Sequence, residues 1–179
     1  MSTDSPGPAP LPLPRSSAVI SSCGRYRYWL ERRWSASLPL TFVMLNPSTA
    51  DATIDDPTIR RCAGFARREG AGGIVVVNLY AFRATNPRDL ASAADPVGTE
   101  CDAHLDVAGA CGCPGAPIIA AWGATKVGRA PYREHDERVA GVLARLRGFG
   151  PVHCLGSTAS GAPRHPLYLP GDAPLTVLP

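Results

Sequence analysis

Two asparagines stand where apolar runs of the chain end, and their side chains could bind a polar ligand. Asn46 follows residues 40–45, and Pro47 stiffens the turn beyond it. The asparagine side chain has one carbonyl acceptor and two amide donors, so it could hold a water molecule or read a ligand edge. The structural alternative is an Asx turn that only closes the strand. Asn78, at the end of residues 73–78, has the same two interpretations.

Three aspartates follow Asn46 within ten residues, close enough for one of them to act as a general base. The segment Asp55-Asp56-Pro57 also has the pattern of a helix start, with an aspartate as N-cap and proline in the first turn. At least one aspartate is therefore structural. We expect either Asp55 or Asp56 to be the cap and Asp51 to be the functional carboxylate.

His165 follows residues 156–164, which are rich in glycine and proline and have no apolar period, so this segment is expected to be a loop. A neutral histidine there can donate a hydrogen bond to an oxygen that gains charge in a transition state. The alternative is an ordinary surface histidine. Three arginines near the expected crevice are candidates for phosphate contacts, namely Arg83, Arg88 and Arg164.

Composition narrows the function classes. The net charge of +3 does not by itself indicate nucleic-acid binding, which usually requires a concentrated basic patch. The longest apolar runs are far too short to cross a membrane, and residues 1–14 do not resemble a signal peptide, so we expect a cytoplasmic protein without membrane contacts. Six scattered cysteines favour free thiols over disulfides. Cys101, Cys111 and Cys113 lack the paired spacing of a zinc site, so neither a metal nor another cofactor is expected.

The order of apolar runs predicts the fold. We expect a disordered Pro-rich tail over residues 1–16 and a single α/β domain over 17–179. Residues 18–22 and 25–30 predict a hairpin with a basic surface of arginines. Helical segments then alternate with the apolar runs 40–45, 73–78, 118–122 and 152–155. This alternation predicts a three-layer α/β/α domain with a central, mainly parallel, four-stranded sheet. The helical segments are expected at 57–70, 89–94, 97–110 and 132–146.

In such a sheet the ligand crevice lies beyond the carboxyl ends of the strands. Polar or glycine-rich residues follow all four apolar runs, so we expect the four exits to meet at one site. The residues concerned are Asn46-Pro47-Ser48, Asn78, Trp122-Gly123, and the loop that leads from Gly156 to His165.

Several segments of the chain, taken in order, resemble the bacterial DUF1643 family. That resemblance covers roughly residues 25–170 and implies a fold, but no activity, because the family's function is unassigned. The segments are Met44-Leu45-Asn46-Pro47-Ser48, residues 77–89, Ala121-Trp122-Gly123 and residues 161–168.

The same segments more distantly resemble the uracil-DNA glycosylase superfamily. The resemblance implies that Asn46 positions water or the base, that Asn78 reads the base edge, and that His165 binds a base carbonyl. Met44 and Ser48 stand where the superfamily motif has glycines, so the entrance is expected to differ in shape. The serine of the usual His-Pro-Ser is replaced by Leu167, which weakens the case for DNA specifically, and the iron-sulfur cysteine pattern of some relatives is absent.

We therefore expect a nucleobase-recognising N-glycosidic hydrolase, similar to a DNA glycosylase, that flips a modified or damaged base of DNA into the crevice. Asn46 and Asp51 would place the water and His165 would stabilise the departing base. The alternatives are a binding module for a nucleobase, nucleotide or nucleic acid without turnover, and an enzyme acting on a free nucleoside or nucleotide. The expected substrate-binding residues are Asn78, Pro47, Ser48, Tyr80, Phe82, Arg83, Trp122, Gly123 and Arg164.

Overall fold

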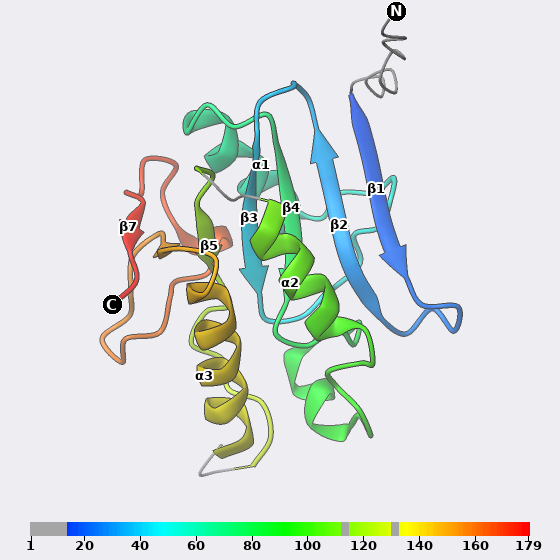
Figure 1. The fold of residues 1–179 in the computed structure, drawn as a ribbon. Coiled ribbons are helices and arrows are strands. Elements are labelled where there is room, and N and C mark those ends of the chain that lie inside the picture. The colour runs from blue at the N-terminus through cyan, green and yellow to red at the C-terminus, as the bar shows by residue number, and fades with distance from the viewer. Residues whose placement is uncertain (1–13, 112–114, 130–132) are drawn as a thin grey trace, which may run out of the picture.

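A computed structural model describes residues 14–111, 115–129 and 133–179. These residues form a mixed α/β fold around one seven-stranded sheet with the order β1-β2-β4-β3-β5-β6-β7 (Figure 1). The strands are β1 (Arg15–Ile20), β2 (Arg27–Arg33), β3 (Pro39–Met44), β4 (Gly73–Asn78), β5 (Ile118–Ala120), β6 (Val152–Cys154) and β7 (Thr176–Val177).

The four apolar runs form the parallel centre of this sheet, as predicted. β3 pairs in parallel with β4 and β5, and β5 pairs in parallel with β6. All residues of β3 and β4 are buried, because helices cover both faces of the sheet. The predicted total of four strands is too low, since antiparallel strands extend the sheet at both edges. The predicted hairpin is formed by β1 and β2, and β2 joins it to the sheet by pairing with β4. Strand β7 consists of only two residues, both exposed, so it leaves no apolar pattern in the sequence.

Three α-helices and two short 3-10 helices complete the described fold. Helix α1 packs on one face of the sheet, and α2 and α3 pack on the other, which gives the predicted three layers (Figure 1). On the α1 face, Ile59 and Phe65 join the same core as Phe42 of β3. On the other face, Leu105 and Leu146 join the core that contains Val43 and Val75. The helices are α1 (Pro57–Arg68), η1 (Pro87–Ser92), α2 (Cys101–Cys111), α3 (Arg133–Arg147) and η2 (Pro166–Tyr168).

The helix starts decide which aspartate is the cap. Asp56 caps α1, because its side chain accepts a hydrogen bond of 2.8 Å from the Ile59 N–H, while Asp55 forms an ion pair with Arg32. Helix α2 begins later than predicted, since Asp95 Oδ1 accepts from the N–H groups of Val97 and Gly98 and closes a turn there.

The adjacent ends of β3 and β4 position the segments that follow them. Met44 is in register with Asn78, and the backbone N–H groups of Leu79 and Tyr80 donate to the carbonyls of Met44 and Leu45. Loops from two neighbouring strands are therefore held side by side at one edge of the sheet.

Two predictions concern the chain outside this core. The Pro-rich tail falls on residues that the structure does not describe, apart from residues 14–16, and β1 begins at Arg15, before the predicted domain boundary at residue 17. None of the helices in the described ranges has both the length and the hydrophobicity needed to span a bilayer.

Candidate functional site

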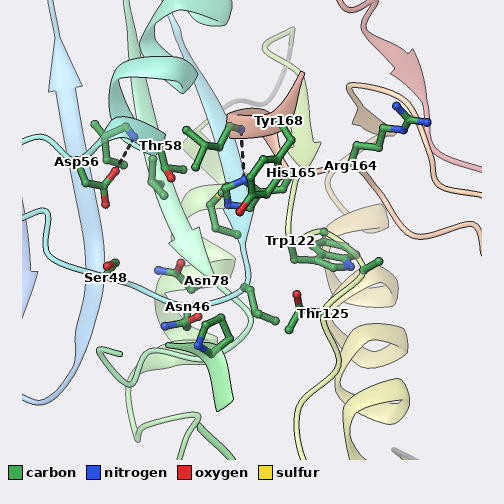
Figure 2. A pocket seen from close by; sticks show the side chains of 18 of the residues that line it. Asn46, Ser48, Asp56, Thr58, Asn78, Trp122, Thr125, Arg164, His165 and Tyr168 are labelled. Carbon is green, nitrogen blue, oxygen red and sulfur yellow. Dashed lines mark hydrogen bonds between the residues drawn. The ribbon is translucent and has the colours of Figure 1, made fainter. Parts of the chain in front are cut away.

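A cavity of about 560 Å³ opens at the carboxyl ends of the parallel strands (Figure 2). This is where a doubly wound sheet binds ligands, and the volume is typical of small-molecule sites. Its wall combines the ends of β3 and β4, the segment after β5, the start of α1 and the residues around η2. Seven predicted site residues contribute to this wall, namely Asn46, Ser48, Asn78, Trp122, Gly123, Arg164 and His165.

Asn78, at the end of β4, presents an unpaired amide to this cavity. The residue is only 2% exposed, and neither its Oδ1 nor its Nδ2 has a hydrogen-bond partner among the residues that the structure describes. Among the described residues it is the only one with two such atoms. Leaving a buried polar atom unpaired costs about 1–3 kcal/mol, so a ligand that pairs with this amide would recover stability that the fold alone lacks.

Asn46 lies beside Asn78 in Figure 2, but its amide nitrogen is fully used. Nδ2 donates to the Pro47 carbonyl at 2.9 Å and to the Ala84 carbonyl at 2.8 Å. Asn46 therefore ties the turn after β3 to the segment after β4. Its Oδ1 has no partner in the described parts of the chain, so the side chain can offer a ligand one acceptor.

His165 reaches the cavity from the N-cap position of η2 (Figure 2). Its Nδ1 accepts a hydrogen bond of 3.3 Å from the Leu167 N–H, so a neutral ring carries its proton on Nε2. Burial lowers the pKa of His165, which favours this neutral form. Gly123 stands next to it with φ +78°, and a Cβ there would lie 3.4 Å from the His165 Cβ. The ring is thus held as a hydrogen-bond donor.

Asp51, the predicted general base, does not line the cavity. Its Oδ1 accepts hydrogen bonds from the backbone N–H groups of Thr53 and Ile54 and from the Thr53 hydroxyl. These backbone hydrogen bonds hold the pKa of Asp51 below its usual value. The cavity's carboxylate is Asp56: its Oδ1 caps α1, whereas its Oδ2 has no partner within the described chain.

Other predicted binding residues are also placed elsewhere. Tyr80 lies in the core on the α2–α3 face, where its hydroxyl is 3.0 Å from Nδ1 of His135. Phe82 packs edge-on against Tyr26, and Arg83 donates to the Gly24 carbonyl at 3.3 Å.

Two further predicted residues, Pro47 and Arg164, form hydrogen bonds within the protein. The Pro47 carbonyl accepts hydrogen bonds from Asn46 and from the Ala84 N–H. Arg164 touches the cavity wall, but Figure 2 shows its side chain pointing away from His165, and its Nε donates to the Ser157 carbonyl at 3.1 Å.

Arg27 is a cavity residue that the sequence placed on a basic surface. It is 2% exposed, and within the described chain its side chain makes one hydrogen bond, from Nη1 to the Ala50 carbonyl at 2.7 Å. Its Nε has no partner, and no carboxylate of the described residues forms an ion pair with it. Burial lowers the pKa of Arg27 to about 10, so the group stays charged at neutral pH. In the sequence, the position of Arg27 between the aromatic residues Tyr26 and Tyr28 was the one feature that could have indicated its burial.

The segment that matches a known family includes nearly all residues of this cavity wall. The profile of the DUF1643 family, described as proteins of unknown function, matches residues 27–167. The chain belongs to the DUF1643 family. Every cavity residue of this DUF1643 protein except Tyr168 and Leu169 falls in the matched range. No curated protein and no solved structure matches the chain, so the resemblance to uracil-DNA glycosylases depends on the motifs alone.

Metal-binding residue types are dispersed in the structure. The described ranges contain no group of three His, Cys, Asp or Glu side chains that could hold a metal ion. Five described cysteines are free thiols, and Cys113 lies outside the described residues. The cavity wall instead brings together an amide, an imidazole donor, a carboxylate and a guanidinium.

Proposed function

We propose that this DUF1643 protein recognises a nucleobase in its cavity and hydrolyses the N-glycosidic bond that joins the base to a sugar. The unpaired amide of Asn78 carries this proposal. The Watson–Crick edge of every nucleobase presents a donor and an acceptor side by side, and an asparagine amide can pair with both. A site built for two such hydrogen bonds rejects ligands that lack them, because its buried polar groups would then stay unpaired.

The neighbouring groups suit the chemistry of this bond. Water forms a bond to the sugar C1′ as the C1′–N bond breaks and its electron pair leaves with the base. His165 Nε2–H donates to the base oxygen on which negative charge develops. Asn46 Oδ1 and the Asp56 carboxylate accept the protons of the attacking water, and the proton that the water loses ends on the departing base.

A stacking partner for the base is also present at the cavity. The two aromatic residues Tyr80 and Phe82, which the sequence predicted to bind the substrate, do not line it. Tyr168 does, is 82% exposed and packs against the His165 ring at 5.4 Å. We assign the stacking role to Tyr168.

The arginines around the cavity favour a free nucleoside or nucleotide over a base in DNA. Arg61 and Arg68 of α1 donate to backbone carbonyls of Leu169, Gly171 and Ala173, and so anchor the C-terminal segment. Arg83 and Arg164 also bond to backbone carbonyls. Side chains committed to the fold in this way are less available to follow a DNA backbone.

Binding without turnover is the second candidate. The observation that favours it is the placement of the carboxylates, since Asp51 lies outside the cavity and one oxygen of Asp56 caps α1. Among the described residues of the cavity wall, one carboxylate oxygen is then left to activate water.

Release of a free base, measured by chromatography, tests the proposed reaction. The protein is incubated with the common nucleosides, their 5′-monophosphates, and single- and double-stranded oligonucleotides that carry altered bases. We expect a free base from a nucleoside or nucleotide, and its loss in His165→Gln. A compound that raises the melting temperature but is recovered unchanged would refute hydrolysis and establish the binding module.

A further inference from the structure

Strand β2 carries two buried arginines whose surroundings differ. Arg32 is 8% exposed, and its guanidinium forms an ion pair of 2.8 Å with Asp55. It also donates to the carbonyls of Glu31 at 2.9 Å and Asp51 at 2.6 Å. Arg32 therefore has a clear structural role, because it fastens the loop before α1 to the sheet.

Arg27 is more deeply buried, yet it has far fewer partners. A guanidinium has five N–H donors, and the described chain engages Arg27 through one hydrogen bond, to the Ala50 carbonyl. No described residue pairs with the edge formed by Nε and Nη2. Such an edge is the one that binds a carboxylate or phosphate through two parallel hydrogen bonds.

The electrostatic surroundings of Arg27 do not supply a counter-ion. Asp56 and Asp51 stabilise its charge from a distance, but Arg83 and Arg32 act against it. A buried charge without a bonded partner is costly, and arginines in this position usually pair with an anion. Because Arg27 lines the cavity, that anion can belong to the ligand.

We infer that Arg27 is the anion-binding residue of the cavity and that it holds the terminal phosphate of a nucleoside monophosphate. This inference depends on the proposed function for the nucleoside part of the ligand. Asn78 would read the base, while Arg27 binds the phosphate through its Nε–Nη2 edge. The cavity of about 560 Å³ lies in the range of sites for ligands of this class.

The depth of Arg27 explains why a terminal phosphate is favoured over one within a nucleic-acid strand. Only 2% of Arg27 is exposed, so a ligand group that binds its guanidinium must itself be buried within the cavity wall. A phosphodiester continues into a further nucleotide on both sides, so binding it to Arg27 would require both continuations to be buried with it. A monoester ends at the phosphate and carries more charge to offset the guanidinium.

Calorimetric titration of three matched probes tests this inference. The probes are inorganic phosphate, the common nucleoside 5′-monophosphates and the corresponding nucleosides, applied to the wild-type protein and three variants. Arg27→Met removes the charge at similar length, Arg27→Lys keeps a point charge without the planar edge, and Arg60→Gln removes an exposed arginine of α1 as the control.

We expect at least one monophosphate to bind roughly 10- to 100-fold more tightly than its nucleoside, as a charge-assisted pair implies. Arg27→Met should abolish this difference and the binding of inorganic phosphate, Arg27→Lys should restore part of both, and Arg60→Gln should change neither. Removal of the unpaired buried charge offsets the lost hydrogen bond to the Ala50 carbonyl, so the melting temperature of Arg27→Met should stay close to that of the wild type, which separates lost binding from unfolding.

The inference and the proposed function can fail separately. Equal affinity for nucleoside and monophosphate, or unchanged phosphate binding in Arg27→Met, would overturn the anion subsite even if a base is released. Arg27-dependent binding of phosphate and a monophosphate, without any base release, would support the subsite and overturn only the hydrolysis.

Discussion

Asn46 follows β3, Asn78 ends the neighbouring parallel strand β4, and both line the same cavity, but their amide nitrogens have opposite hydrogen-bonding states. The Asn46 amide nitrogen bonds to two backbone carbonyls, whereas both polar atoms of the Asn78 amide lack partners. Arg32 and Arg27 of β2 repeat this contrast. One set of polar groups holds the loops together, and the other is open to a ligand. Substitutions should therefore lower stability in the first set and ligand affinity in the second.

Arg32→Met should have the largest effect on stability. It removes the ion pair with Asp55 and leaves the Asp51 carbonyl without its donor. We expect the free energy of unfolding in urea to fall by about 3 kcal/mol, because the loss of a buried charged donor strands its acceptors. Arg33→Met, which loses only a 4.0 Å pair with Glu31, should cost under about 1 kcal/mol. Equal losses in both variants would contradict the assigned role of Arg32.

Asn46→Ala should have the next largest effect. Both hydrogen bonds of the amide nitrogen are lost, the one to Pro47 within the turn and the one that ties the turn to the Ala84 carbonyl, so the free energy of unfolding should fall by about 1–3 kcal/mol. Asn86→Ala is the matched control, because Asn86 accepts one exposed hydrogen bond from the Arg88 N–H. If Asn46→Ala is no less stable than this control, Asn46 is not the structural asparagine of the pair.

The dependence of stability on pH tests the protonation state of His165 and should show the smallest effect of the three. Its pKa is lowered in the fold, so the unfolded chain binds the proton more readily below about pH 6.5. The stability that the neutral ring contributes is thus complete above that pH and is lost as the pH falls through the lowered pKa. Denaturant titrations from pH 8 to 5 should show a smaller decline for His165→Gln than for the wild type. Parallel declines would contradict a half-buried His165 that the fold keeps neutral.

The sequence predicts the parallel centre of the fold well, because strands buried on both faces leave continuous apolar runs. It also locates the crevice, since Asn46, Asn78 and His165 follow the ends of such runs and all line one cavity. The roles of the aspartates depend on tertiary contacts. Asp51, Asp55 and Asp56 are nearly adjacent in sequence, and Arg32 and the α1 cap decide which one faces the cavity.

Two other features could not be predicted from local patterns. The Ala84 carbonyl that saturates the Asn46 amide lies 38 residues away along the chain. The burial of Arg27 depends on the loop that carries Ala50 folding over β2, so its sequence neighbourhood suggests only a basic hairpin.

The most direct test of the open amide is calorimetric titration of Asn78→Leu with the nucleoside or nucleotide that most raises the wild-type melting temperature. Leucine has a similar shape without the two unpaired polar atoms, so the variant should be as stable as the wild type or more stable, by about 1–2 kcal/mol. We predict that its affinity for that ligand falls roughly 10- to 100-fold. Unchanged affinity, or a fall in affinity that accompanies a lower melting temperature, would contradict the account.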